Sequence, residues 1–302
     1  LTLDDEIKSL KVIKKINENS DLDLVPTFMG AHAFPPEYID NKDGYVDLIC
    51  NKMIPKVRED GLAEFCDVFC EDGYFNIEQS RKILETAKSF GLIPRVHADE
   101  FKSFGASELA AEVGAASADH LMVINSDGMK DLSKSGTIAT LLPGTTFFLN
   151  KAEYANGRRL IDNGCFVALA SDFNPGTCTI RSLPNIMLLS MQHCGLTLDE
   201  SFLGVTYNAA KSLMKSDNVG LIKERDDLYR QCSKADVGLT FTGKTIKPEF
   251  RTEGGSQRPF EMMGLGLVPL VSDLKEWEDF FVKDGYAYSC NSDSADSIKT
   301  AL

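Results

Sequence analysis

The chain has 302 residues, of which 43% are hydrophobic, so it is long enough for one large barrel or for two ordinary domains. Its formal net charge of −13 disfavours nucleic-acid and anionic-membrane partners, because no basic field is present to attract phosphates. No apolar stretch approaches the roughly 18 residues of a membrane span, and the charged residues 1–15 lack a signal-peptide core. We therefore expect a cytoplasmic protein that acts on a small molecule.

The eight cysteines are scattered along the chain, and none forms a Cys-x-x-Cys pair. Several stand inside apolar runs, as in Phe65-Cys66-Asp67-Val68-Phe69-Cys70. This pattern indicates reduced thiols that pack in the core rather than disulfides or a thiolate metal site.

Six short apolar runs recur along the first 170 residues and are typical of buried strands; they lie at 23–28, 64–69, 93–96, 116–121, 138–142 and 165–170. Helical periodicity fills several of the gaps, at 77–90, 107–113 and 152–162, and a glycine follows each of these helices. Six successive strand–helix units predict a parallel sheet with right-handed crossovers. The pattern is more than half of an eight-stranded α/β barrel.

Polar clusters close three of these apolar runs. They are Val-His-Ala-Asp-Glu at 96–100, Ala-Asp-His at 118–120 and Ala-Ser-Asp-Phe-Asn-Pro-Gly-Thr at 170–177. We therefore expect His97, His120 and Asp172 at the carboxyl ends of strands, facing one mouth of the barrel. Imidazole and carboxylate groups that converge there favour a metal-activated water.

Each of these residues also has an ordinary structural interpretation. Asp172 is well placed for an Asx turn or a helix N-cap before Pro175. Glu100 alone is a weak signal, since charged residues after strands are commonly solvated. His193 follows a helical apolar run and is typical of a surface or satisfied core histidine.

Five segments together carry a more specific signal. They are the run from Val25 to Tyr38, the 96–101 and 118–121 clusters, Leu-Leu-Pro-Gly-Thr-Thr at 141–146, and 171–177. In this order they resemble the imidazolonepropionases, amidohydrolase-superfamily enzymes of histidine degradation, over about residues 1–222. The resemblance implies an amidohydrolase-type TIM barrel that binds zinc or iron.

The resemblance also implies roles for individual residues. His97 and Asp172 are the implied metal ligands, and Asp172 also takes the proton of the attacking water. His120 contacts the substrate or the hydroxide, and Glu100 contacts the imidazolone ring and moves protons. The substrate side chain is held by His32 and by the last loop, through Asn174, Gly176 and Thr177. The implied reaction is hydrolysis of 4-imidazolone-5-propanoate to N-formimidoyl-L-glutamate.

The chain also departs from the family. Amidohydrolases of this kind carry a His-x-His pair on the first barrel strand, whereas this chain has four histidines and no such pair. We therefore expect an incomplete TIM barrel over residues 1–222 that lacks its first two strands, binds metal weakly and is inactive as it stands. Two open sheet edges also favour aggregation or pairing with another chain, for example as a homodimer.

Residues 223–302 no longer follow the amidohydrolase pattern. They resemble the C-terminal half of a GT-B glycosyltransferase, in which Glu253 and Glu261 match a Glu-x7-Glu signature that binds a nucleotide sugar. We expect a small Rossmann-like α/β segment with strands near 237–241, 268–271 and 286–289. The alternative is that residues 235–236 open the amidohydrolase β-domain and that both glutamates are solvated.

Three other functional interpretations stay open. The first is another amidohydrolase, such as a deaminase, which would lack a propionate clamp around His32. The second is a nucleotide-sugar transferase fragment or donor-binding module that depends on Glu261. The third is a non-functional chimera of fragments, which the abrupt change of pattern near residues 222–225 also fits.

Overall fold

The structure is a computed structural model that describes residues 2–20 and 23–218, together with residues 237–240, 268–272, 282–283, 288–290 and 297. The chain divides into two compact units, Leu1–Gly220 and Leu221–Leu302. The boundary expected at residue 222 lies outside the described residues.

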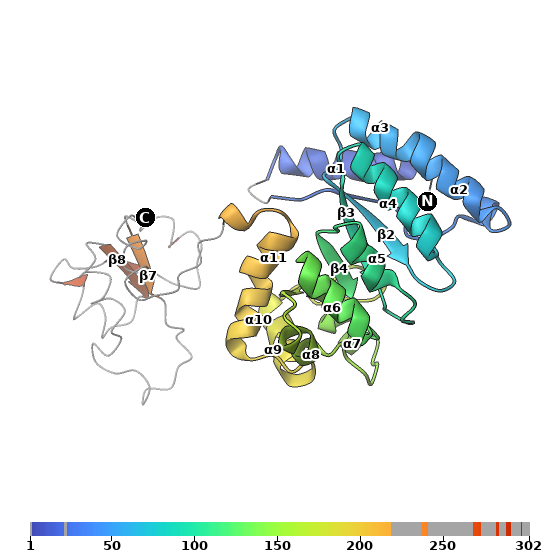
Figure 1. The fold of residues 1–302 in the computed structure, drawn as a ribbon. Helices are drawn as coiled ribbons and strands as arrows, with labels where there is room; N and C mark the ends of the chain where they lie inside the picture. The colour runs from blue at the N-terminus through green and yellow to red at the C-terminus, as the bar shows by residue number, and fades with distance from the viewer. Residues whose placement is uncertain are drawn as a thin grey trace. The chain divides into compact units, whose positions relative to one another are not determined.

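The first unit is built on one six-stranded sheet. Its strands follow the order β1-β2-β3-β4-β5-β6, and every neighbouring pair is parallel. Figure 1 labels β2, β3 and β4, the central strands of this sheet. The strands are β1 Thr27–Ala31, β2 Phe65–Cys70, β3 Ile93–Ala98, β4 Ser117–His120, β5 Ile138–Leu141 and β6 Val167–Leu169. All six expected strands are therefore present, in sequential order.

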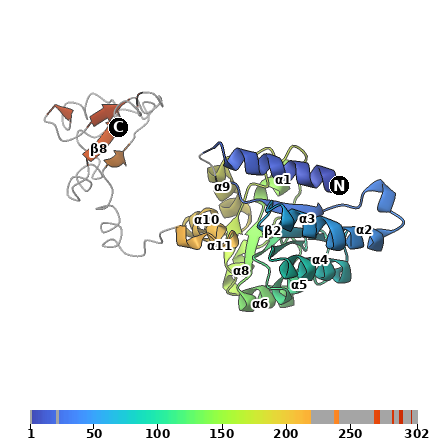
Figure 2. The same cartoon turned by 90° about the horizontal axis from the view of Figure 1, so that it is seen from above.

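Helices precede, connect and follow the six strands. They are α1 Leu3–Asn17, α2 Lys42–Leu48, α3 Ile54–Glu59, α4 Ile77–Ser89, α5 Ala106–Glu112, α6 Ser126–Ser135, α7 Pro143–Phe148, α8 Gly157–Asp162, α9 Leu183–His193, α10 Leu198–Val205 and α11 Tyr207–Ser212, with short 3-10 helices at Pro36–Tyr38 and Ser216–Asn218 and a π-helical segment at Ile49–Met53. Seen from above, α3, α4, α5, α6 and α8 follow one another around the outside of the sheet (Figure 2). Among the described residues, no helix is both long and apolar enough to cross a membrane.

Local chemistry explains the bounds of α4. Asn76 and Gln79 form a reciprocal capping box at its start. Its buried residues, Ser80, Ile83, Leu84 and Ala87, recur at helical spacing and give it one face to pack. The helix ends just before Gly91, whose φ of +77° suits a residue without Cβ.

The expected starting residues of one strand and one helix were wrong. The first strand begins at Thr27 and not at residue 23, because the backbone N–H and C=O of Leu24 bond to the side chain of Asn17, both at 2.6 Å. The third expected helix begins at Gly157 and not at residue 152, because the Asn156 side chain caps it by accepting from the N–H of Arg159. In both cases an asparagine side chain competes with the regular backbone pattern.

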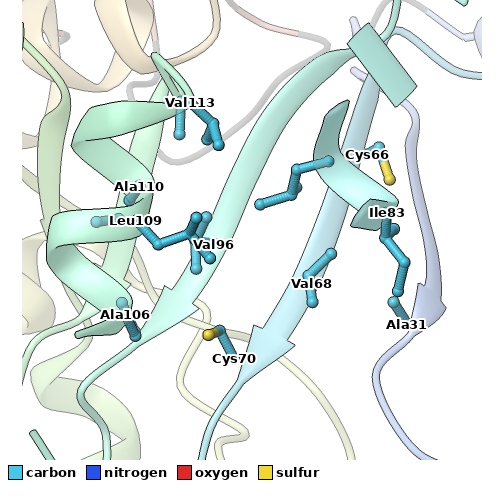
Figure 3. Close-up of a cluster of buried hydrophobic side chains, with 14 of the residues drawn as sticks. Ala31, Cys66, Val68, Cys70, Ile83, Val96, Ala106, Leu109, Ala110 and Val113 are labelled. Atoms are coloured by element: carbon cyan, nitrogen blue, oxygen red, sulfur yellow. The ribbon is translucent and has the colours of Figure 1, made fainter. Parts of the chain in front are cut away.

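The sheet has two chemically different faces. Cys66, Val68 and Cys70 of β2 and Val96 of β3 belong to the buried hydrophobic cluster beneath α4 and α5, where Ile83 and Leu109 meet them (Figure 3). Because side chains alternate along a strand, Asp67 and Phe69 of β2 and Arg95 and His97 of β3 face the other side. This second face, which is the interior of the barrel, carries polar groups.

Among the residues that the structure describes, β1 and β6 each pair with one neighbour only, so this part of the sheet is open at both ends. Sequential parallel strands with helices on the outside fit an incomplete TIM-type barrel, as expected.

The second unit contains three described strands, β7 Val237–Thr240, β8 Val268–Ser272 and β9 Tyr288–Cys290, which pair in parallel in the order β7-β8-β9. They lie close to the positions expected from the sequence. The Rossmann-like class of residues 223–302 stays a prediction.

We expect Gly157→Ala to lower the free energy of unfolding by about 1–3 kcal/mol, because a Cβ there overpacks the core. That Cβ would lie 2.3 Å from Cδ1 of Leu196 and 3.0 Å from the carbonyl oxygen of Cys194. Urea unfolding followed by circular dichroism measures the effect. The exposed Gly176→Ala is the control, since its Cβ meets only the Asn174 side chain, at 3.3 Å. Equal stability of the two variants would contradict the tight packing of α8.

Candidate active site

A cavity of about 280 Å³ opens at the carboxyl ends of the strands of the first unit. It is lined by His32, Phe69, Tyr74, His97, Glu100, Phe101, His120, Thr145, Asp172, Asn174 and Thr177. The structure therefore brings together seven of the eight residues that the sequence analysis named within this unit. Gly176 is the exception and does not line the cavity.

Backbone geometry places three polar residues of this mouth in unusual positions. Asp99 after β3, His120 at the end of β4 and Asp172 after β6 have φ values of +51°, +79° and +52°. Non-glycine residues in the left-handed region are held there at a cost of order 1–3 kcal/mol each. Such local strain, repeated at the carboxyl ends of three strands, is typical of a functional site.

Three imidazole rings lie in a row across the cavity. The ring centroids of His32 and His97 are 5.1 Å apart, and those of His97 and His120 are 5.2 Å apart. Phe69 stacks on His32 and meets His97 edge to face. His32 keeps a buried Nδ1 without a hydrogen-bond partner among the described residues, and its burial lowers its pKa.

His97, which is partly buried, pairs with the buried Asp67. Its Nδ1 lies 2.6 Å from Oδ1 of Asp67, on the next strand. Burial alone lowers the pKa of His97, but the charge of Asp67 and the hydrogen bond to it outweigh burial and raise that pKa to about 9. The same pairing outweighs the effect of burial on Asp67 and holds its pKa below the usual value. In the absence of metal, the pair is an imidazolium and a carboxylate.

His120, the next ring after His97, forms a second pair with Glu100. Nε2 of His120 is 3.7 Å from Oε2 of Glu100, and both side chains are almost buried. Burial, together with the charge of His97, lowers the pKa of His120 to about 3, so its imidazole is neutral. Burial also raises the pKa of Glu100. A neutral imidazole beside a carboxyl group with a raised pKa can exchange protons with a substrate.

The last loop is organised by Asn174. Its Oδ1 accepts hydrogen bonds from the N–H groups of Gly176 and Thr177, and its Nδ2 donates to Asp172 O and to Thr177 Oγ1. The Asx turn considered for Asp172 therefore belongs to Asn174. The Asp172 side chain instead accepts a hydrogen bond from Thr145 Oγ1 at 2.7 Å.

Glu71 supports the loop that carries Glu100. Its buried carboxylate accepts hydrogen bonds from the N–H groups of Phe101, Lys102 and Asp72, at 2.9, 3.2 and 2.9 Å. These three hydrogen bonds to one carboxylate hold the backbone next to Glu100 in place.

We expect Glu71→Gln to lower the free energy of unfolding by about 1.5–3 kcal/mol, because an amide NH₂ would face backbone donors. Chemical unfolding followed by circular dichroism measures this change. The exposed Glu85→Gln serves as the matched control and should change stability by less than about 0.5 kcal/mol. A similar small effect at position 71 would show that the carboxylate does not hold this loop.

The donor set of the cavity fits a metal ion. His97 keeps Nε2 and Asp172 keeps Oδ1 without a hydrogen-bond partner among the described residues, since the other atom of each is taken by Asp67 or Thr145. Imidazole nitrogen and carboxylate oxygen are ordinary ligands of zinc and iron. A further group with ligand atoms within 4.8 Å of one another joins His97 to Asp67 and Asp119.

Asp67 and Glu71 were not expected in this region from the sequence, and Thr145 was noted there only as part of the 141–146 segment. Asp67 lies in the apolar run at 65–70, in which the two cysteines were interpreted and the aspartate was not. The signal that could have found it is a single charge inside an otherwise apolar strand that is buried along its whole length.

The fold of the first unit is shared with solved enzymes. The chain is similar in structure to the 5-methylcytosine deaminase of Klebsiella pneumoniae liganded with 5-fluorocytosine, with a TM-score of 0.57 and 19% identity over 74% of this chain and 60% of that chain. It is also similar to the guanine deaminase of C. acetobutylicum, with a TM-score of 0.55 and 15% identity over 70% and 56% of the two chains. At these identities the likeness concerns the fold alone.

Sequence similarity is much higher to one group of enzymes. The chain is 50% identical over 223 residues to the imidazolonepropionase of Geobacillus sp. and 46% identical over 225 residues to that of Bacteroides fragilis, in each case 74% of this chain. It spans about half of their length, 52% and 54%. No family model matches the chain.

These comparisons leave the interpretation of residues 223–302 untested. Glu253 and Glu261 lie outside the described residues. The glycosyltransferase-like assignment of this segment therefore stays a prediction.

Proposed function

We propose that the first unit forms the catalytic face of an imidazolonepropionase-type amidohydrolase, which hydrolyses 4-imidazolone-5-propanoate to N-formimidoyl-L-glutamate. The observation that carries the proposal is the convergence in one cavity of His32, His97, Glu100, His120 and Asp172, which come from separate segments of the chain. The identity of 50% to an imidazolonepropionase supports the same assignment.

A metal fits the donors that remain free in the cavity. We propose zinc or iron, held by Nε2 of His97 and Oδ1 of Asp172 together with ligands that this chain lacks. When bound, such an ion polarises water so that hydroxide forms near neutral pH.

The chain's own residues move the protons. Asp172 accepts the proton of the attacking water, whose oxygen adds to the ring carbonyl carbon. The ring C–N bond then breaks, and Glu100 delivers a proton to the leaving nitrogen, so that one water is consumed and a carboxylate and an amidine nitrogen are formed. The neutral His120 lies beside Glu100 and contacts the carbonyl or the attacking water.

The propionate side of the substrate is assigned to His32 and the last loop. The buried Nδ1 of His32 lacks a partner among the described residues and is available to a ligand. Because the Asn174 side chain is used within its own loop, we expect contacts from this loop to come from Thr177 and from the backbone near Gly176.

Turnover by an extended chain tests the proposal. As it stands, the chain lacks the His-x-His pair, and we expect it to hydrolyse 4-imidazolone-5-propanoate at no more than the background rate. With the two preceding strands and their His-x-His pair added at its N-terminus, we expect zinc- or iron-dependent ring opening. Cytosine and guanine serve as control substrates. Deamination of either, without ring opening of the imidazolone, would favour the deaminase alternative and overturn the proposal.

A further inference from the structure

A largely buried charged network surrounds His97, the middle ring of the imidazole row. It consists of Asp67 on β2, Arg95 and His97 on β3, and Asp119 on β4. Register places His97 beside Asp119 and Asp67 beside Arg95, so the two acids flank the two bases on the barrel face of the sheet. The opposite face of the same strands carries the apolar residues Cys66, Val68 and Val96 (Figure 3).

The geometry of this network does not suit a metal among Asp67, His97 and Asp119. The 2.6 Å between Nδ1 of His97 and Oδ1 of Asp67 is a hydrogen-bond distance. Two ligands of one tetrahedral zinc, each at about 2.0–2.2 Å from the ion, stand roughly 3.3 Å apart. Arg95 also lies 3.3 Å from Asp119 and already supplies the cation for that carboxylate.

The network instead fixes the orientation of the His97 ring. Asp67 is almost fully buried, and its carboxylate engages His97 through Nδ1. Because Asp67 binds Nδ1 of His97, Nε2 is the ring nitrogen that remains available in the cavity. His32 and His120 line the same cavity. A carboxylate on the far nitrogen of a ligating histidine sets its orientation and strengthens it as a ligand.

We propose that Asp67 is a positioning residue that holds His97 by Nδ1 and thereby presents Nε2 to the metal, while Arg95 and Asp119 neutralise its surroundings. This inference rests on the proposed function, because it requires metal at His97 and Asp172. Asp67 itself does not touch the metal or the substrate.

Zinc affinity of the whole chain tests this inference without requiring turnover. Competition with a chromophoric chelator gives the zinc dissociation constant, and the His97→Ala variant sets the level of adventitious binding. We expect Asp67→Ala to weaken the His97-dependent site by about 10–100-fold. We expect Asp67→Asn to weaken it less, because the amide oxygen still accepts a hydrogen bond from Nδ1.

Asp119→Asn is the matched control. It removes a buried acid from the same network without touching the His97 hydrogen bond, so we expect loss of stability by circular dichroism but little change in zinc affinity. Equal weakening by Asp119→Asn and Asp67→Ala would overturn the inference in favour of a metal within the network. Unchanged affinity in Asp67→Ala would also overturn it.

The proposed metal site and the proposed role of Asp67 are contradicted by different results. If His97→Ala and Asp172→Asn leave zinc binding at the wild-type level, the proposed metal site fails and the role of Asp67 fails with it. If those two variants lose zinc while Asp67→Ala keeps it, the proposed function stands and only the positioning role is wrong.

Discussion

In the chain extended with a His-x-His strand, Asp172→Asn is expected to lower kcat by at least about 10²–10⁴-fold. Asparagine has nearly the same shape and can still accept the hydrogen bond that Thr145 donates to Asp172. The substitution removes the proton acceptor and weakens one of the proposed metal ligands, but it leaves the loop in place. Steady-state kinetics on 4-imidazolone-5-propanoate measures the loss, and circular dichroism checks that the fold is unchanged.

The companion variant Glu100→Gln separates proton transfer from binding. Glutamine keeps the size of the side chain beside His120 but cannot deliver a proton, so kcat should fall by about 10²-fold or more while KM changes less. The exposed Asp40→Asn should leave both constants unchanged. If Asp172→Asn retained wild-type turnover, or if Glu100→Gln raised only KM, the assigned roles would be incorrect.

The strands of the sheet could be predicted from the sequence because each strand is marked by residues that are adjacent in the chain. Each buried strand is a short apolar run, and the polar clusters directly follow those runs, as with His97 and His120. Parallel strands bring their carboxyl ends to the same edge, so residues far apart in the chain were expected in one mouth. The cavity contains them.

The wrong boundaries and the missed site residue depend on interactions that are not local in the hydrophobic pattern. The first strand and the third expected helix start late because single side chains, Asn17 and Asn156, bond to the backbone from outside the hydrophobic pattern. Asp67 was missed because its partner stands on the next strand, and strand register is not visible in a sequence. Contacts that depend on register or on one side chain's rotamer need the folded structure.

Beside the cavity, Asp99 makes the stability of the first unit depend on pH. It is fully buried, bonds to the hydroxyl of Ser107 and lies near Glu71 and Glu108. Burial is the largest cause that raises its pKa from 3.8 to about 6, and the two neighbouring acids add to the effect. The folded state therefore holds this proton more tightly than the unfolded chain does.

The sign of the pH dependence follows from this shift. The stability from the protonated group is fully present below about pH 3.8, and it is lost as the pH rises through about 6. Each pKa unit corresponds to about 1.4 kcal/mol, so the loss reaches about 2–3 kcal/mol above that range. Asparagine mimics the protonated acid and tolerates the φ of +51°.

We therefore expect Asp99→Asn to be more stable than the wild-type chain by about 2–3 kcal/mol at pH 8, with the difference vanishing toward pH 4. Urea unfolding at a series of pH values measures it by circular dichroism, because Trp277, the only tryptophan, belongs to the second unit. The exposed Asp40→Asn should show no such trend. A pH-independent difference, or a less stable variant at pH 8, would mean that the ionised Asp99 is accommodated in the fold without cost.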